Sequence, residues 1–283
     1  MRRAILFGLV LGCLCPSVWA DDKYTLREKV HDGQVIALEL TNDGNFKTRT
    51  SESGQTSTRQ QKVKQYLKAT MTILAVKDGS ATSARVQVDP GSYDIEKDDD
   101  APIQKSACWY AGKTVVLTRA DDESVKNDAK GAPPEARKVD LDNLNDLLSP
   151  DEDMYPDGPV TVGDSWEVSE KLARHSDLNP GDKLLAHVRL DWVKQIDGKQ
   201  MAQLTCVCGI IRYQEQNVEE DDEYTSVMLV EIAAGQIVRA DSTGTVKYLT
   251  PAGEAMQVSG GGDFSGHCAV LSTSPPSGAT TQP

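Results

Sequence analysis

The chain has 283 residues, with 43 acidic and 30 basic side chains and a net charge of −13. This balance disfavours binding to nucleic acid or to an anionic membrane, because both need basic surfaces. After the N-terminus, no run is long and apolar enough to cross a bilayer, which takes about 20 residues, so we expect a soluble or peripheral protein.

The N-terminus has the pattern of a secretory signal peptide. Arg2 and Arg3 precede an apolar run from Ala4 to Leu14, and small residues stand three before and one before a cleavage point after Ala20. We therefore predict that residues 1–20 are removed and that the protein is periplasmic or extracellular. Loss of the two arginines would take the net charge from −13 to −15.

A competing interpretation uses Cys13. The segment from Leu9 to Cys13 loosely resembles a bacterial lipobox, which would give a lipid-anchored protein that begins at this cysteine. The residue before the cysteine fits, but the leucine before that is unusual, and a good cleavage site follows at Ala20. We favour the cleaved form without an anchor.

Strand signals dominate from Tyr24 onward, because β-branched and apolar residues recur in short stretches broken by turns. Glycine supplies the positive φ that a tight antiparallel turn requires, so these breaks predict hairpins. Three are expected in an N-terminal β-rich half over residues 21–120, at His31-Asp32-Gly33, Asn42-Asp43-Gly44 and Lys77-Asp78-Gly79.

One stretch has helical spacing instead. Asp140 can cap its start and Ser149-Pro150 ends it. We predict a short amphipathic helix near residues 140–148, inside a connection over residues 121–158. Its apolar face would be formed by Leu141, Leu144, Leu147 and Leu148.

The strand pattern resumes in a C-terminal β-rich half over residues 159–271, followed by a Ser-, Thr- and Pro-rich tail, 272–283, that we expect to be disordered. Trp166 to Leu172 is predicted to be a strand that echoes Tyr24 to Val30. The turn at Asp197-Gly198 echoes the one at Asp78-Gly79. This order is consistent with an internal duplication, although antiparallel meanders share such turns in any case.

Regular short strands with one helix predict a mainly β protein. We expect curved antiparallel sheets, arranged as a sandwich or an open barrel, with two duplicated halves as one interpretation. A parallel α/β sheet is disfavoured because the crossover helices are missing.

Four cysteines follow the leader, and an even number in an exported chain favours disulfides. Two of them lie two residues apart on a predicted strand, so their side chains point to the same face and we expect each to pair with a distant partner. Buried free thiols are one alternative. A metal site with His267 is another, although the ligand spacing is poor. The candidates are Cys108, Cys206, Cys208 and Cys268.

Gly163-Asp164-Ser165-Trp166 has the letters of a GDS esterase nucleophile block. That chemistry needs an acid and a base close to the serine, and the nearest candidate pair, Asp263 and His267, stands beside a run of glycines. We favour a structural interpretation in which a turn leads into a strand and Trp166 packs inward. A serine hydrolase that uses Ser165 is kept as the alternative function.

The other polar motifs favour structural roles, so we predict no metal, cofactor or catalytic residue. The histidines show no ligand spacing, the acidic runs lack the spacing of an EF-hand loop and are interpreted as solvated loop charges, and the glycine run is interpreted as a loose turn. The histidines are His31, His175, His187 and His267; the acidic runs are Asp98–Asp100, Asp151–Asp153 and Glu219–Glu223; the glycine run is Gly260–Gly262.

The block Pro159-Val160-Thr161-Val162-Gly163-Asp164-Ser165-Trp166, together with an earlier Gly33-Gln34 turn, resembles an uncharacterised family of exported bacterial proteins, classed as a domain of unknown function, with a Pro-Val-x-Val-Gly-Asp-x-Trp block. The resemblance covers most of residues 24–250. It implies a two-part β fold with no catalytic residues.

Because no acid, base and nucleophile are assembled in the sequence, we favour an exported, non-enzymatic protein that acts by binding or structural association in the cell envelope. Curved sheets offer concave faces, so fold analogy suggests a small apolar or lipid-like ligand. The sequence does not specify a partner.

Overall fold

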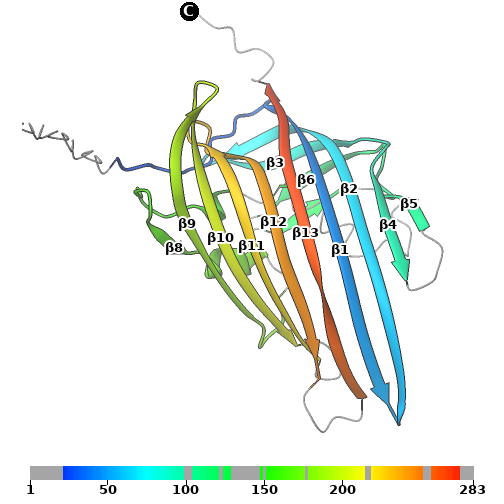
Figure 1. Ribbon diagram of the computed structural model, residues 1–283. Helices are drawn as coiled ribbons and strands as arrows, with labels where there is room; N and C mark the ends of the chain where they lie inside the picture. Colours follow the sequence, from blue (N-terminus) through cyan, green and yellow to red (C-terminus); the bar gives the residue numbers. More distant parts are fainter. Residues whose placement is uncertain are drawn as a thin grey trace, which may run out of the picture.

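The computed structural model describes residues 22–98, 104–120, 124–128, 147–148, 151–175, 178–213, 218–250 and 256–274. Within these ranges one α-helix, α2 (Ser169–His175), and one 3-10 helix, η1 (Asp151–Met154), accompany a single 13-stranded antiparallel sheet. The prediction of a mainly β fold with a curved antiparallel sheet is confirmed (Figure 1).

The strands are long in the middle of the sheet and short at its edges. They are β1 (Val35–Glu52), β2 (Gln55–Lys77), β3 (Ser80–Val88), β4 (Tyr93–Asp98), β5 (Gln104–Ala107), β6 (Thr114–Arg119), β7 (Val125–Asn127), β8 (Ser165–Glu167), β9 (Lys183–Ile196), β10 (Lys199–Tyr213), β11 (Glu219–Glu231), β12 (Gln236–Leu249) and β13 (Met256–Ser274).

The sheet is open. Its order is β7-β6-β3-β2-β1-β13-β12-β11-β10-β9-β8, with β4 and β5 attached to β2, and among the described residues the edge strands β7 and β8 do not pair with each other. In Figure 1 the sheet curves so that β3 and β6 lie behind the central strands.

The first and the last described strands lie side by side in the middle of the sheet. The first strand, β1, pairs along its whole length with β2 on one side and with β13 on the other. The N-terminal and C-terminal halves are therefore joined by the β1–β13 ladder. The last strand continues to Ser274, three residues into the predicted tail.

Two predicted turns are confirmed. Asp78-Gly79 joins β2 to β3 and Asp197-Gly198 joins β9 to β10, with positive φ at both residues, as a type I′ turn requires. The predicted turn at Asn42-Asp43-Gly44 is wrong, because these residues lie inside β1. Strands pair with them on both sides and hold the backbone extended, and the chain turns at Ser53-Gly54 instead.

The predicted strand before Gly33 is also wrong. Residues 24–30 form only a single bridge, between Tyr24 and Val160. The segment instead crosses one end of the sheet, where Lys29 N donates a hydrogen bond to the Ala234 carbonyl and Val30 N donates to the Gly79 carbonyl. Figure 1 shows this segment in blue along the upper end of the sheet.

The predicted strand from Trp166 to Leu172 ends early. The structure has a three-residue strand, β8, and then α2, which begins at Ser169. Ala186 N of β9 donates a 2.9 Å hydrogen bond to Ser169 Oγ, which ties the start of α2 to the sheet, and Glu170 lies in the first turn, where a carboxylate is favourable. The indole of Trp166 packs against the core, as expected.

The predicted helix near 140–148 lies mostly outside the described residues. Its last two leucines are described: they form a turn, and Leu148 is buried.

Two hydrophobic clusters cover the same face of the sheet, which we call the inner face. The N-terminal cluster contains Leu67, Val86 and Leu117, and the C-terminal cluster contains Leu190 and Leu204. Burial of such side chains stabilises the fold by roughly 1.5–3 kcal/mol each. Alternation along each strand places the remaining side chains on the opposite, outer face.

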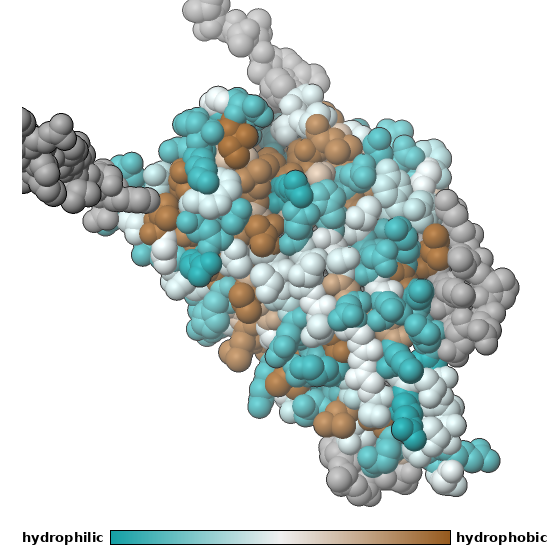
Figure 2. Space-filling view, in the orientation of Figure 1, coloured by the Kyte–Doolittle hydropathy of each residue, from teal (hydrophilic) through white to brown (hydrophobic). Residues whose placement is uncertain are grey.

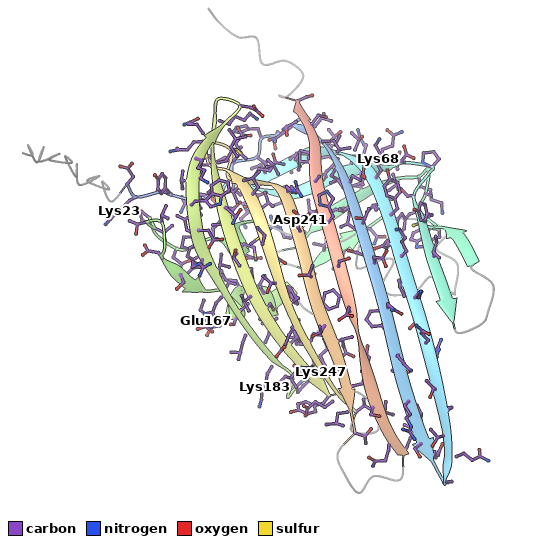
Figure 3. All side chains as sticks on the ribbon, in the orientation of Figure 1. Lys23, Lys68, Glu167, Lys183, Asp241 and Lys247 are labelled. Carbon is purple, nitrogen blue, oxygen red and sulfur yellow. The ribbon has the colours of Figure 1, made fainter. Side chains whose placement is uncertain are left out.

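The outer face is polar and carries ion pairs. Figure 3 shows Asp241, Lys68 and Lys247 on this face, and Asp241 contacts both Arg239 and His267 at 2.7 Å. In Figure 2, teal and pale residues cover most of this side of the molecule, and the brown apolar residues form separate patches.

Candidate functional site

The middle of the inner face is built from small residues. Strands β12 and β13 lie between the two hydrophobic clusters, and between Gly260 and Cys268 the one large apolar side chain at an inner-face position of β13 is Phe264. Because the neighbouring side chains are short, a pocket of about 320 Å³ opens there. The small inner-face residues are Ala240, Ser242 and Gly244 on β12 and Gly262, Gly266 and Cys268 on β13.

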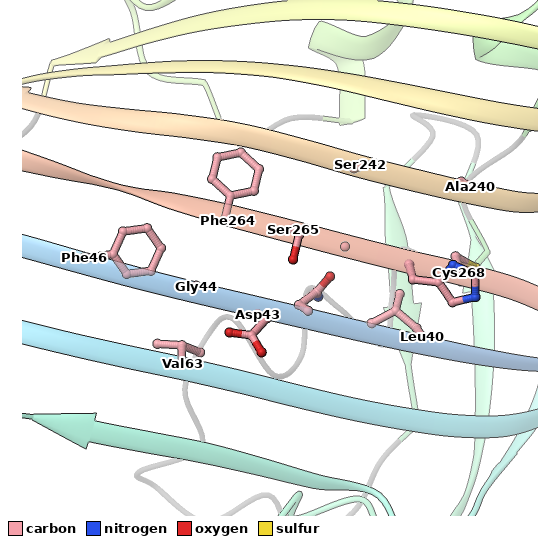
Figure 4. A pocket seen from close by; sticks show the side chains of 13 residues that line it. Leu40, Asp43, Gly44, Phe46, Val63, Ala240, Ser242, Phe264, Ser265 and Cys268 are labelled. Carbon is pink, nitrogen blue, oxygen red and sulfur yellow. The ribbon is translucent and has the colours of Figure 1, made fainter.

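Apolar side chains form most of the pocket wall. In Figure 4, Phe46 and Phe264 project from β1 and β13 at one end, and Leu40 and Cys268 lie at the other end; Val63 adds a wall from β2. The chain has three phenylalanines. One is in the predicted leader, and the other two line this pocket.

The two aromatic rings lie over glycines of the sheet. A Cβ atom at Gly44 would lie 2.6 Å from Phe46 Cε2, and one at Gly244 would lie 2.6 Å from Phe264 Cζ. Since glycine alone leaves room for these rings, the Gly–Phe pairs fix the floor of the pocket.

A row of polar side chains crosses the inner face at the pocket. Asn42 Nδ2 donates a 3.0 Å hydrogen bond to Gln65 Oε1, and the hydroxyls of Ser226 and Ser242 lie 2.6 Å apart. Gly266 stands between the two pairs in the strand register. Asn42 and Ser242 therefore line the apolar pocket with uncharged hydrogen-bonding groups, and Gln65 and Ser226 continue the polar row beside it.

The wall toward the C-terminal cluster is uncharged near neutral pH. Burial raises the pKa of Cys206 to about 12, and burial also raises the pKa of the Cys208 thiol and of the Tyr224 phenol, which hydrogen-bonds to Cys208. The Tyr224 ring is 6.3 Å from that of Phe264. Protonated thiols and phenols keep this side of the site suited to an apolar ligand.

A charged group occupies another part of the inner face, at the end of β10 and the start of β11. Arg212 contacts Glu220 at 3.0 Å and also contacts Asp222. Burial raises the pKa of Asp222 against the opposing effect of Arg212, and burial together with the two carboxylates raises the pKa of Tyr248 to about 12. The interpretation of Glu219–Glu223 as solvated loop charges is wrong, because the run lies in β11.

The structure places the four cysteines in three regions and joins none of them by a disulfide. Cys108 is buried in the N-terminal cluster, whereas Cys206 and Cys208 are buried side by side in the C-terminal cluster. Cys268 lies on β13, three strands from β10, which is roughly 14 Å at about 4.8 Å per strand. A disulfide spans less than about 7 Å between Cα atoms, so Cys268 does not reach that pair; disulfide formation stays a prediction.

The residues of the alternative hydrolase are not brought together. Ser165 is exposed on edge strand β8, and Asp263 and His267 lie on β13, five strands away in the sheet order. His267 pairs with Asp241 on the outer face.

The structure also separates the remaining histidines and describes part of the acidic runs. His31 is exposed, His187 lines a groove on the outer face, and His175 ends α2. Within the described residues, no three His, Cys, Asp or Glu side chains gather as metal ligands would.

The run Gly260–Gly262, predicted to be a loose turn, lies inside β13, so that prediction is wrong. In the same ranges, no helix has the length and hydropathy needed to span a membrane.

A second hollow, of about 870 Å³, lies on the outer face across β9 to β13. Its exposed apolar residues, Leu185 and Val207, stand among threonines and the carboxylates of Glu223 and Asp263. The inner-face pocket is the better candidate site, because its walls are more uniformly apolar and it lies against the core.

Sequence reasoning missed the phenylalanines and the polar row. A signal was present in the spacings Gly44-x-Phe46 and Gly262-x-Phe264, which put a glycine and a phenylalanine on the same face of each of two strands. The sequence does not predict the register that places β1 and β13 side by side.

No family model and no curated protein matches the chain. Among solved structures, it is similar to lipovitellin, described for its lipid–protein interactions, with 8% identity over 89% of this chain and a TM-score of 0.49. The match spans about a quarter of the lipovitellin chain, 26%.

Two further similarities cover most of both chains. DynF from the dynemicin biosynthesis pathway of Micromonospora chersina has 9% identity over 95% of this chain and 96% of its own, with a TM-score of 0.20. A DUF1329 family protein from Desulfovibrio piger has 8% identity over 82% and 85%, with a TM-score of 0.14. At these values no function transfers to this chain.

Proposed function

We propose that this protein binds one small apolar ligand in the inner-face pocket and acts outside the cytoplasm without catalysing a reaction. The observation that carries the proposal is the pocket itself, walled by Leu40, Phe46, Val63 and Phe264 between two packed hydrophobic clusters. Small inner-face residues on two adjacent strands leave this space unfilled. Water molecules gain little free energy by entering such a pocket. An apolar ligand, in contrast, gains the full free energy of removing its surface from water.

The volume limits the size of the ligand. About 320 Å³ is at the lower end of the usual range for ligand sites. At about 30 Å³ for a water-sized group, the pocket accommodates roughly ten such groups, which is one chain of about ten to twelve carbons or a small ring system. The predicted signal peptide supports a role in the cell envelope or outside the cell.

The test is a titration of the mature protein with N-phenyl-1-naphthylamine, a neutral dye whose fluorescence rises in apolar surroundings. We expect saturable binding at one site. Ala240→Leu places three additional carbon atoms in the pocket and should weaken the affinity at least roughly tenfold, which corresponds to about 1.4 kcal/mol.

Ala269→Leu is the matched control, because Ala269 stands on the neighbouring strand with its side chain on the outer face. It should bind the dye like the unchanged protein. Absence of saturable binding, or an equal loss of affinity in both variants, would contradict the proposal.

A further inference from the structure

The polar row across the pocket indicates which chemical class of ligand the site accepts. It consists of Asn42 and Gln65 on one side of Gly266 and Ser242 and Ser226 on the other. Polar groups in an apolar pocket cost free energy unless they find hydrogen-bond partners. A ligand that supplies those partners is therefore favoured over a plain hydrocarbon.

Asn42 offers both a donor and an acceptor. Within the described part of the chain its amide makes one side-chain hydrogen bond, through Nδ2 to Gln65. Its Oδ1 reaches over Gly266, since a Cβ atom there would lie 2.9 Å from it. The carbonyl oxygen thus lies at the pocket floor, and Nδ2 has a second hydrogen besides the one that it donates to Gln65.

Ser242 offers a hydroxyl on the other side of the same glycine. Its oxygen lies 2.6 Å from that of Ser226, so one of these hydroxyls donates to the other. The hydroxyl that accepts keeps its own hydrogen for another acceptor. Asn42 and Ser242 therefore flank a glycine-floored position where one polar group of a ligand can both donate and accept.

The described pocket lining presents no charge to the ligand. Asp43 and His267 contribute to the lining, but their side chains are paired on the outer face, with Lys64 at 3.4 Å and with Asp241 at 2.7 Å. Burial of an unpaired carboxylate or ammonium group is costly. An ionised head group therefore lacks a counter-charge here.

We propose that the pocket selects a neutral amphiphile, one apolar chain with an uncharged hydroxyl or ester group held by Asn42 and Ser242, over the corresponding carboxylate or amine. This inference rests on the proposed function and adds the chemical class of the ligand. The hydrogen-bonding groups give specificity, and the phenylalanines and leucine give most of the affinity.

Competition against bound N-phenyl-1-naphthylamine tests the inference with ligands of equal chain length. We expect 1-monolauroylglycerol and dodecanol to displace the dye at concentrations at least roughly tenfold lower than laurate or dodecylammonium at pH 7. Equal or stronger displacement by laurate or dodecylammonium overturns the inference but leaves the proposed function intact. Failure of the dye to bind overturns the proposed function itself.

Asn42→Leu removes the amide and keeps a side chain of similar size. It should lower the affinity for 1-monolauroylglycerol, relative to the affinity for the dye, at least roughly tenfold. Ser242→Ala, a milder change, should act in the same direction.

Asn45→Leu is the matched control, because Asn45 stands on the same strand and accepts a 3.3 Å hydrogen bond from Gln60 on the outer face. It should leave both affinities unchanged. If both Asn42→Leu and Ser242→Ala keep the full preference for 1-monolauroylglycerol over laurate and dodecylammonium, the assignment of these two residues to the ligand's polar group is overturned.

Discussion

Arg212 shows how a single side chain stabilises charge on a mostly apolar face. It lies between Glu220 and Asp222, whose side chains are only 13% and 14% exposed. Burial raises the pKa of Asp222, and Arg212 opposes that effect. The ionised form of the Asp222 carboxylate is therefore favoured by this guanidinium.

We expect Arg212→Met to destabilise the protein by about 3–5 kcal/mol at pH 7, because it leaves the buried carboxylate of Asp222 without its guanidinium partner. A carboxyl with a raised pKa holds its proton more tightly in the folded state, so its contribution to stability is lost as the pH rises through that pKa. Without Arg212 the pKa of Asp222 rises further. The destabilisation caused by Arg212→Met should therefore become smaller as the pH falls toward 5. Urea unfolding at pH 5 and pH 7 measures both values.

Arg189→Met is the control for that measurement. Arg189 pairs with Asp191 at 2.7 Å but is 59% exposed, so its loss should change the free energy of unfolding by at most about 1 kcal/mol. Equal destabilisation by the two variants, or a loss from Arg212→Met that does not vary with pH, would refute the assigned role.

At the scale of a single element, β13 is the strand that decides the shape of the inner face. A Cβ atom at Gly262 would lie 2.1 Å from the Asn45 carbonyl oxygen, and one at Gly261 would lie 2.3 Å from that of Val246. The backbones of β1 and β12 thus approach β13 too closely for any side chain at these positions. The glycine run is a requirement of close strand packing.

Gly262→Ala should therefore destabilise the protein by about 1–3 kcal/mol, since a methyl group there forces neighbouring backbone to move. The measurement is the midpoint of denaturant unfolding. Gly158→Ala serves as control, because no atom lies within 4 Å of the position its Cβ would take. A Gly262→Ala variant as stable as the Gly158→Ala variant would show that β13 tolerates a side chain.

Local signals predicted those elements that the local sequence determines. The turns at Asp78-Gly79 and Asp197-Gly198 follow from positive φ at two adjacent residues. The failures at Asn42–Gly44 and Gly260–Gly262 share one cause, which is that each segment is held by partner strands on both sides. The same long-range register brings Phe46 and Phe264 together, so the pocket could not be read from the sequence.

For the whole molecule, the decisive feature is the seam between the two hydrophobic clusters. The β1–β13 ladder crosses it in the sheet, and the segment 24–30 crosses it at one end, with Leu26 in the C-terminal cluster and Val30 in the N-terminal one. Gly235 fits beneath this segment because a Cβ atom there would lie 1.6 Å from the Arg27 carbonyl oxygen. The pocket opens at this seam, where neither half fills the inner face.

Native mass spectrometry of the mature protein, exported by a bacterial host and compared with its Ala240→Leu variant, tests the central claim most directly. Our account predicts a one-to-one adduct with the mass of a small neutral amphiphile on the unchanged protein, and a strongly reduced adduct on the variant. The account would be contradicted if the unchanged protein carried no ligand even after incubation with 1-monolauroylglycerol. It would also be contradicted if both proteins carried the adduct to the same extent.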